Sequence, residues 1–454
     1  MLVGVQLPGV DAVEHAASMA ELARLVDTLG YTVVGQVSQR REGLASAAVL
    51  GEGKLAELAA WTGGGGIVTH GPQRVVNKAR TKWEAVDAEV AGEPKDPPVE
   101  PDPGDEGAAP PRGRKADLVV VDHDLSPSQA RNLGKATGVE VLDRTGVIVE
   151  IFHRHAQSRE ARLQVEIARL NYLVPRLRAS GGGERQRGGI GGKGAGESAL
   201  ELDRRKVRDR VAQLRAELAA IEKEQGTRRA RRNDQLRVAL VGYTNAGKSS
   251  LMRALTGSEV LVADRLFATL DTTVRALHPE SVPRILVSDT VGFIKKLPHD
   301  LVASFRSTLD EALEASLLLL VVDASDPTFR PQLEVTRAVL AEIGASGVPT
   351  RLVLNKIDRV SEDDRAALAG EFPEALQLSA KDPEDVAGLR ETLVAWFDRD
   401  LVETELFVPW ARAALLGEIH AGARVLAERH EGDGVYIRVR GRTADVARLR
   451  GRVA

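Results

Sequence analysis

One eight-residue segment constrains the fold more than any other part of the chain. Residues 242–249 read Gly-Tyr-Thr-Asn-Ala-Gly-Lys-Ser and match the pattern G-x-x-x-x-G-K-[ST]. They follow the apolar run Val238–Val241 and precede the helical run Leu251–Leu255. Backbone N–H groups of such a loop wrap phosphates, with Lys248 on the β- and γ-phosphates and the Ser249 hydroxyl on Mg²⁺. The residues expected to contact the nucleotide here are Gly242, Tyr243, Thr244, Asn245, Ala246, Gly247, Lys248 and Ser249.

Two later motifs select the base. Asn355, Lys356 and Asp358 follow the apolar strand Leu352–Leu354, and the Asp358 carboxylate can accept both N–H groups on the guanine edge. Adenine offers no such donor pair, so an adenine nucleotide would leave a buried charge unpaired. After a further strand come Ser379, Ala380 and Lys381, a segment that fits a backbone contact to the guanine O6.

A fourth motif is expected to contact the γ-phosphate and the Mg²⁺ ion. Asp289, Thr290, Val291 and Gly292 follow the strand Ile285–Val287. The Asp289 carboxylate can hold the Mg²⁺ shell through water, and the Gly292 N–H can sense the γ-phosphate. The four motifs stand in the order of a GTPase domain, each at a strand end, where ligands of parallel sheets bind. We therefore expect a P-loop GTPase domain with a doubly wound, mostly parallel sheet.

A nucleotide-sensing loop is expected between the first motif and Asp289. Residues 267–273 read Phe-Ala-Thr-Leu-Asp-Thr-Thr, and such a loop offers a threonine hydroxyl to Mg²⁺. Thr269, Thr272 and Thr273 compete for that role, and spacing alone does not choose among them.

The residue after Gly292 is unusual for a GTPase. Many GTPases place a glutamine there to orient the attacking water, whereas this chain has Phe293. A phenyl ring cannot hydrogen-bond that water. Either another group or a partner completes the site, with slow turnover alone, or Phe293 packs against the sheet while a different polar residue works.

Composition excludes several classes of protein. The 454 residues include no cysteine, which rules out disulfide scaffolds, thiolate metal sites and cysteine nucleophiles. The first ten residues show no signal peptide, and the longest apolar run, Leu317–Val322, is far short of a membrane span. We expect a monomeric, cytoplasmic protein without stable membrane insertion.

The first 150 residues predict an N-terminal α/β domain. Strands are expected at Leu2–Leu7, Tyr31–Val37, Ile67–Thr69, Asp117–Val121 and Val139–Leu142, and helices at Val13–Leu29, Lys54–Trp61 and from Ser126-Pro127 onward. Residues 92–115 carry seven prolines and six acidic residues, and we interpret them as a disordered insertion.

Residues 151–233 predict an antiparallel coiled-coil hairpin of two helices. One seam is Leu163, Ile167, Leu170, Val174 and Leu177; the other is Val207, Val211, Leu214, Leu218 and Ile221. The intervening residues 181–196 include nine glycines and form the expected mobile, basic tip. From Arg154 to Arg237 the chain has 21 Lys/Arg and 11 Asp/Glu, a net of +10 within a protein of net charge −3. Such a surface suits phosphate groups, although a solvated helical face would have the same charge.

Two further domains complete the chain. Residues 234–400 form the predicted GTPase domain. Residues 401–454 predict a small α+β domain, with strands Glu405–Val408, Val425–His430 and Val435–Arg440, helices Pro409–Ile419 and Ala444–Arg450, and a hairpin turn at 431–434.

With these motifs in place, the chain resembles the HflX family of ribosome-associated GTPases over most of its length. The strings that carry the resemblance are far more specific than the P-loop. They lie at 117–121, 125–129, 131–133, 141–145, 158–160, 164–166, 175–177, 200–205, 267–271 and 289–293, the last with its phenylalanine. Residues 1–90 match more loosely.

The resemblance implies a GTPase that binds the large ribosomal subunit and splits or rescues stalled ribosomes, with hydrolysis stimulated by the ribosome. It implies that Ser249, Thr269 and Asp289, the last through water, hold Mg²⁺, and that Lys248, Thr269 and Gly292 act in hydrolysis. It adds Phe267, Ala268, Thr269, Leu270 and Asp271 to the nucleotide site. The N-terminal domain and the hairpin would reach ribosomal RNA, in agreement with the basic middle of the chain.

Three other functions compete with this reading. A GTP-gated ribosome-assembly factor that binds RNA and splits nothing would have the same sequence features. An RNA-binding module with a vestigial nucleotide site conflicts with intact Lys248, Ser249, Asp289 and Asp358. A P-loop ATPase or kinase conflicts with Asp358.

Overall fold

The computed structural model describes residues 1–44, 49–67, 115–180, 199–230, 235–257, 266–267, 273–295 and 311–453. The chain divides into two compact units. The first comprises Met1–Ile148 with Val174–Gly196, and the second comprises Val149–Leu173 with Glu197–Ala454. The predicted domain boundaries at 150, 233 and 400 stay predictions.

The first unit is built on a parallel four-stranded sheet. The strand order is β2 (Gln36–Arg40), β1 (Leu2–Gln6), β3 (Leu118–Val121) and β4 (Glu140–Asp143). Successive residues of β1 face opposite sides of the sheet. Val3 and Val5 join a core with α2 (Glu52–Thr62) and α3 (Pro127–Thr137), whereas a Cβ at Gly4 would lie 2.6 Å from the sulfur of Met19 on α1 (Ala12–Thr28). Helices therefore cover both faces.

The predicted elements of this unit are mostly present. Ser126 caps α3 as expected, with reciprocal bonds between Ser126 and Gln129. The predicted strand Tyr31–Val37 begins too early, because the residues that pair with β1 start at Gln36. Of the predicted strand Ile67–Thr69 only Ile67 is described, and it is 72% exposed and belongs to no strand. Most of the predicted insertion at 92–115 lies outside the described residues.

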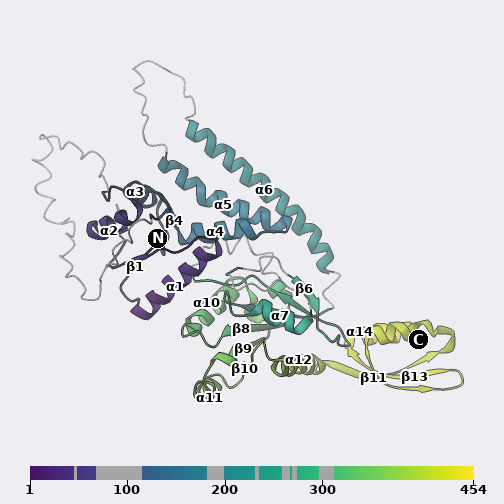
Figure 1. Cartoon of the computed structure of the whole chain (residues 1–454). Helices are drawn as coiled ribbons and strands as arrows, with labels where there is room; N and C mark the ends of the chain where they lie inside the picture. Colours follow the sequence, from purple (N-terminus) through teal and green to yellow (C-terminus); the bar gives the residue numbers. More distant parts are fainter. Residues whose placement is uncertain are drawn as a thin grey trace, which may run out of the picture. The chain divides into compact units, whose positions relative to one another are not determined.

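Two long helices carry most of the predicted seam residues in one cluster. Val174 is absent from this cluster, the side chain of Leu177 lies outside the described part of the chain, and the coiled-coil hairpin as a whole stays a prediction. In α5 (Arg159–Ser180) and α6 (Ala199–Ala230), Leu163 and Ile167 pack against Val211 and Leu214. The ion pairs Arg210–Glu166 and Arg159–Glu217 join residues in opposite sequence order, as in two antiparallel helices. Figure 1 shows these helices running side by side. The tip at 181–196 lies outside the described residues.

The GTPase domain has a six-stranded sheet with two cores. Its strand order is β10 (Leu376–Gln377), β9 (Thr350–Asn355), β8 (Leu317–Asp323), β5 (Leu236–Gly242), β7 (Ile285–Asp289) and β6 (Thr273–Ala276), and only β6 is antiparallel. One face packs α7 (Lys248–Thr256) and α12 (Pro383–Asp398); the other packs α10 (Phe329–Glu342) and α11 (Glu362–Glu371). Short 3₁₀ turns lie at Ala345–Gly347 and Ile357–Arg359. This is the P-loop α/β fold that the motifs predicted.

The C-terminal domain is a three-stranded antiparallel sheet covered on one face. The order is β11 (Leu401–Pro409), β13 (Gly434–Arg442) and β12 (Arg424–His430). Helices α13 (Ala414–Gly422) and α14 (Thr443–Val453) pack one core with Leu406, Ile437 and Val439. The predicted helix from Pro409 begins later, after a 3₁₀ turn at Trp410–Arg412. Figure 1 shows α14 lying over one side of β11 and β13.

Candidate nucleotide-binding site

The P-loop connects β5 to α7 through two glycines that no other residue could replace. Gly242 has φ +153°, and a Cβ there would lie 2.1 Å from the carbonyl oxygen of Val321. Gly247 has φ +95° and precedes the first residue of α7; a Cβ there would lie 2.2 Å from the Asn355 Nδ2. This tight path leaves the N-terminus of α7 at the end of a buried strand, an arrangement that favours bound phosphate.

Lys248 and Ser249 occupy the first turn of α7. The Lys248 ammonium is buried and donates to the carbonyl oxygens of Gly242 and Tyr243, at 3.0 and 2.9 Å. Burial lowers the pKa of Lys248 from 10.5 to about 8, although the nearby Asp289 carboxylate acts in the opposite direction. The Ser249 hydroxyl donates to Asp289 Oδ2 at 2.6 Å. A hydroxyl beside a carboxylate is a donor set that suits Mg²⁺.

The Asp289–Gly292 segment lies directly against the P-loop. A Cβ at Gly292 would lie 2.9 Å from Thr244 Cα and 3.0 Å from the Lys248 Nζ, so only glycine allows this approach. Thr290 donates its hydroxyl to the carbonyl of Leu240 at 2.8 Å, which ties the segment to β5.

Phe293 is a core residue. It is 2% exposed and packs with Val241, Ala312 and Leu320 on one face of the sheet. Its N–H donates to the Gly242 carbonyl at 3.1 Å, and its carbonyl accepts from the Thr244 N–H at 2.7 Å. The ring therefore packs against the sheet, which is one of the two roles that the sequence left open.

The base-recognition motifs surround a cavity of about 230 Å³. Its lining comprises Asn245, Gly247, Ser250, Asn355, Lys356, Asp358, Arg359, Ser379, Ala380 and Lys381. Asn355 links both sides of this cavity, because its Nδ2 donates to the Ala246 carbonyl at 2.8 Å and its Oδ1 accepts from the Ala380 N–H at 3.1 Å. Ser379 donates its hydroxyl to Asp358 Oδ1 at 2.8 Å and so orients that carboxylate.

Two acidic residues that the sequence analysis did not select support this end of the site. Asp323 ends β8 and pairs with Lys356 at 2.7 Å, and the Lys356 ammonium also reaches the Asn245 carbonyl at 2.8 Å. Asp385 on α12 accepts from the Ser379 N–H at 2.7 Å. The position of Asp323 at the end of a buried parallel strand was a usable signal, whereas Asp385 has none in the sequence.

Within the predicted sensing loop, residues 267–273, the structure describes only Phe267 and Thr273, the latter as the first residue of β6. Ala268, Thr269, Leu270 and Asp271 lie outside the described residues, so the choice of threonine stays a prediction. Phe267 is described: it has φ +57° and is 3% exposed, and its ring packs edge-on against Phe152 at 4.6 Å between centroids. Its side chain therefore serves packing.

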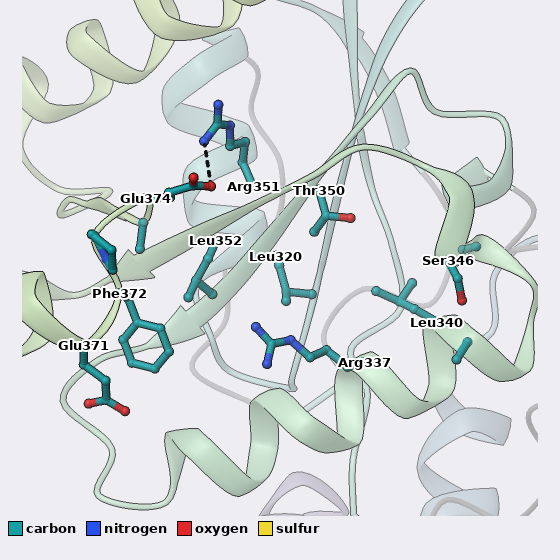
Figure 2. A pocket seen from close by; sticks show the side chains of 14 residues that line it. Leu320, Arg337, Leu340, Ser346, Thr350, Arg351, Leu352, Glu371, Phe372 and Glu374 are labelled. Atoms are coloured by element: carbon teal, nitrogen blue, oxygen red, sulfur yellow. Dashed lines mark ion pairs between the residues drawn. The ribbon is translucent and has the colours of Figure 1, made fainter.

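A larger cavity lies elsewhere on the GTPase domain. It measures about 500 Å³ and lies among β8, β9 and α10, with Leu320, Leu340 and Leu352 on its walls. Figure 2 shows Arg337 reaching across it and the ion pair between Arg351 and Glu374, whose N–O distance is 3.6 Å, at its edge. None of the P-loop or base-recognition residues lines it, so the smaller cavity remains the candidate nucleotide site.

Family models match most of the chain. Residues 237–356 match the 50S ribosome-binding GTPase, residues 155–232 the GTP-binding GTPase middle region, and residues 16–69 and 108–153 the GTP-binding GTPase N-terminal region. The chain is 62% identical over 451 residues to the GTPase HflX of Gluconacetobacter diazotrophicus, covering 99% of this chain and 96% of that protein. This chain belongs to the HflX family of GTPases.

Two further similar proteins are a second GTPase HflX and a solved GTP-binding protein. The GTPase HflX of Escherichia coli K12 is 41% identical over 340 residues, covering 74% of this chain and 80% of its own. A crystal structure of a GTP-binding protein from Sulfolobus solfataricus in complex with GDP aligns with a TM-score of 0.41 and 22% identity, over 87% of this chain and all of that chain. As a member of the HflX family, the protein is an enzyme that binds and hydrolyses GTP.

No helix in the described ranges has both the length and the hydropathy that crossing a bilayer requires.

Proposed function

We propose that this HflX-family GTPase binds the large ribosomal subunit and splits or rescues stalled or stressed ribosomes, with GTP hydrolysis driving its release. The observation that carries the proposal is the match of residues 237–356 to a family of GTPases described as binding the 50S ribosome. The basic stretch from Arg154 to Arg237 supports it, because ribosomal RNA presents a dense array of phosphates. On this proposal the protein works in the cytoplasm as a monomer.

The nucleotide site would work with Mg²⁺. Ser249 and Thr269 would bind the ion directly and Asp289 through water, while the ion supplies charge neutralisation to the phosphates. The Lys248 ammonium now donates to two carbonyl oxygens of the P-loop, and it would donate to phosphate oxygens instead when nucleotide binds. Gly292 would donate its N–H to the γ-phosphate.

Asp358 would read the guanine base, supported by its hydrogen bond from Ser379. Asp358→Asn keeps the shape but replaces one acceptor oxygen by a donor. We expect the preference for GDP over ADP to be lost, with guanine affinity falling at least about 100-fold because a buried charged pairing contributes several kcal/mol. Competition between labelled GDP and unlabelled xanthosine diphosphate checks the assignment, since xanthine offers an acceptor that suits the new amide. An unchanged preference for guanine would reject this role.

The first test of the ribosomal role is GTP turnover with and without purified large ribosomal subunits, with ATP in parallel. The Phe293 ring cannot hydrogen-bond the attacking water, and on this proposal a group of the large subunit positions that water. Large subunits should therefore stimulate GTP turnover strongly and leave ATP turnover unchanged. A GTP turnover rate that large subunits do not change would indicate that the partner of this GTPase is another molecule.

The alternative is a GTP-gated assembly or RNA-binding factor without splitting activity. Large subunits would stimulate GTP turnover under this alternative as well, so turnover does not separate the two functions. Sedimentation of ribosomes does. Adding the protein and a non-hydrolysable GTP analogue to intact ribosomes should convert them into free subunits if splitting is the function. Intact ribosomes with bound protein, or binding only to isolated large subunits, would favour the alternative.

A further inference from the structure

The C-terminal domain has an open sheet face that the GTPase machinery does not use. In β11 and β13, Leu406, Ile437 and Val439 are buried beneath the two helices. Side chains alternate along a strand, so the neighbouring residues point the other way. Among residues 401–453, all of which are described, no helix covers that second face.

Aromatic rings and an arginine form one row across this face. Phe407, Tyr436 and Arg429 are direct cross-strand partners on the three strands. The rings of Phe407 and Tyr436 have centroids 4.7 Å apart, and the Arg429 guanidinium lies 4.8 Å from the centre of the Tyr436 ring. Both rings are only partly buried, and the Arg429 side chain is 65% exposed. Two partly exposed rings therefore stand in one row with a cation that lies over one of them.

The next two rows add positive charge. Arg438 is in register with Glu405, yet it forms no ion pair with any described residue. Arg440 is in register with Glu403 and Arg424, and it contacts Glu403 only at 3.9 Å. On this face the three strands carry four arginines, at 424, 429, 438 and 440, and two glutamates, at 403 and 405. Arg429 also pairs with Glu431 at 3.1 Å and Arg424 with Asp398 at 3.6 Å, so among the described residues Arg438 is the arginine of this face without an ion pair.

We propose that this face, defined by Phe407, Tyr436, Arg429 and Arg438, binds single-stranded RNA. Unpaired bases stack on aromatic rings and on arginine planes, while arginines contact the backbone phosphates. An acidic protein surface would form ion pairs with the arginines, but it would offer no planar bases to stack on the row of rings. The inference goes beyond the proposed ribosomal role, because the C-terminal domain lies outside the three matching family models, which end at or before residue 356.

The test measures binding of a fluorescent, unstructured RNA of about 12 nucleotides to the full-length protein, with GDP present and salt varied. Tyr436→Leu keeps apolar volume in the sheet and should weaken binding about tenfold by removing one stacking ring. Arg429→Ala combined with Arg438→Ala should reduce the slope of log K against log salt by about 1.4, the value for two phosphate contacts on a single strand.

Arg448→Ala is the matched control. Its side chain is also 65% exposed and lies on α14, on the helical side of the same domain, where it pairs with Asp445. It should leave affinity and slope unchanged. Crosslinking with 4-thiouridine RNA should place adducts on the peptides that contain Phe407 and Tyr436. Unchanged RNA affinity in both test variants, or adducts confined to other parts of the chain, would overturn the proposal without bearing on GTP turnover or large-subunit binding.

Discussion

At the scale of single residues, burial decides what Phe293 can do. Its ring fills the core between β5 and β8, so a glutamine at 293 would carry its amide into that core rather than toward nucleotide. Phe293→Gln should therefore lower the free energy of unfolding by about 3 kcal/mol without raising GTP turnover. Phe293→Leu, which keeps the apolar character, should cost about 1 kcal/mol. Urea unfolding followed beside turnover checks both, and a stable, faster glutamine variant would contradict the core role.

Lys248 gives the site a dependence on pH. Its pKa of about 8 lies below the 10.5 of the unfolded chain, so between these values the unfolded state binds more protons and the nucleotide-free protein gains stability as pH rises. Bound phosphates favour the charged ammonium and raise that pKa. GDP binding at pH 8 should therefore take up a fraction of a proton. Calorimetry in buffers of different ionisation enthalpy measures it, and at pH 6.5, where Lys248 is already charged, the uptake through this residue should vanish.

At the scale of secondary-structure elements, a buried ion network joins three parts of the first unit. Arg144, at the start of α4 (Arg144–His155), pairs with Glu21 on α1 and with Asp122 after β3, the latter at 2.7 Å. Ser18 donates to the second oxygen of Asp122 at 2.6 Å. The Arg144 side chain is 1% exposed, so each of these carboxylates is paired with a buried cation.

Arg144→Met should weaken this unit by about 3–5 kcal/mol, because it removes one partner of two buried ion pairs. Hydrogen exchange at the amides of β1 and β3 is the suitable measurement, since a chain with several cores need not unfold in one step. Arg154→Met, on the same helix, removes an exposed pair with Glu150 and should change the free energy of opening that exchange measures by less than about 0.5 kcal/mol. Adding Glu21→Gln to Arg144→Met should recover part of the lost protection at these amides. Equal exchange rates in the wild-type protein and all variants would show that the ion network does not stabilise this unit.

The elements that sequence reasoning found share a local signal, and those that it missed do not. The P-loop, the Ser126 cap and the seam residues can be predicted from short segments, because neighbouring residues determine their conformation. Helix α4 contains Gly146, Val147, Ile148 and Val149, which favour a strand, yet Asp143 caps it by accepting from the Gly146 N–H at 2.8 Å. β6 pairs with β7 only as an antiparallel edge, a choice made by tertiary contacts. The burial of Phe293 and the support from Asp385 likewise depend on residues distant in sequence.

At the scale of the whole molecule, charge is unevenly distributed along the chain. The protein carries −3 overall, while residues 154–237 carry +10, so the remaining residues carry −13. Acidic regions repel ribosomal RNA, and a basic segment must therefore supply the attraction and orient the protein. Binding to large subunits is then expected to weaken steeply with salt even though the net charge is negative.

Charge reversal in the predicted hairpin tip tests where that attraction originates. Glutamate at Arg185, Arg187 and Lys193 should weaken large-subunit binding and flatten its salt dependence, while GDP affinity, which depends on the P-loop and base motifs, stays unchanged. A matched variant that reverses Arg284, Arg337 and Arg448 makes the same change in net charge on exposed side chains outside the tip, each in a local ion pair. If the two triple variants lose binding equally, the effect is one of overall charge, and the tip is merely a linker. Loss confined to the tip variant would assign the first contact with ribosomal RNA to residues 181–196.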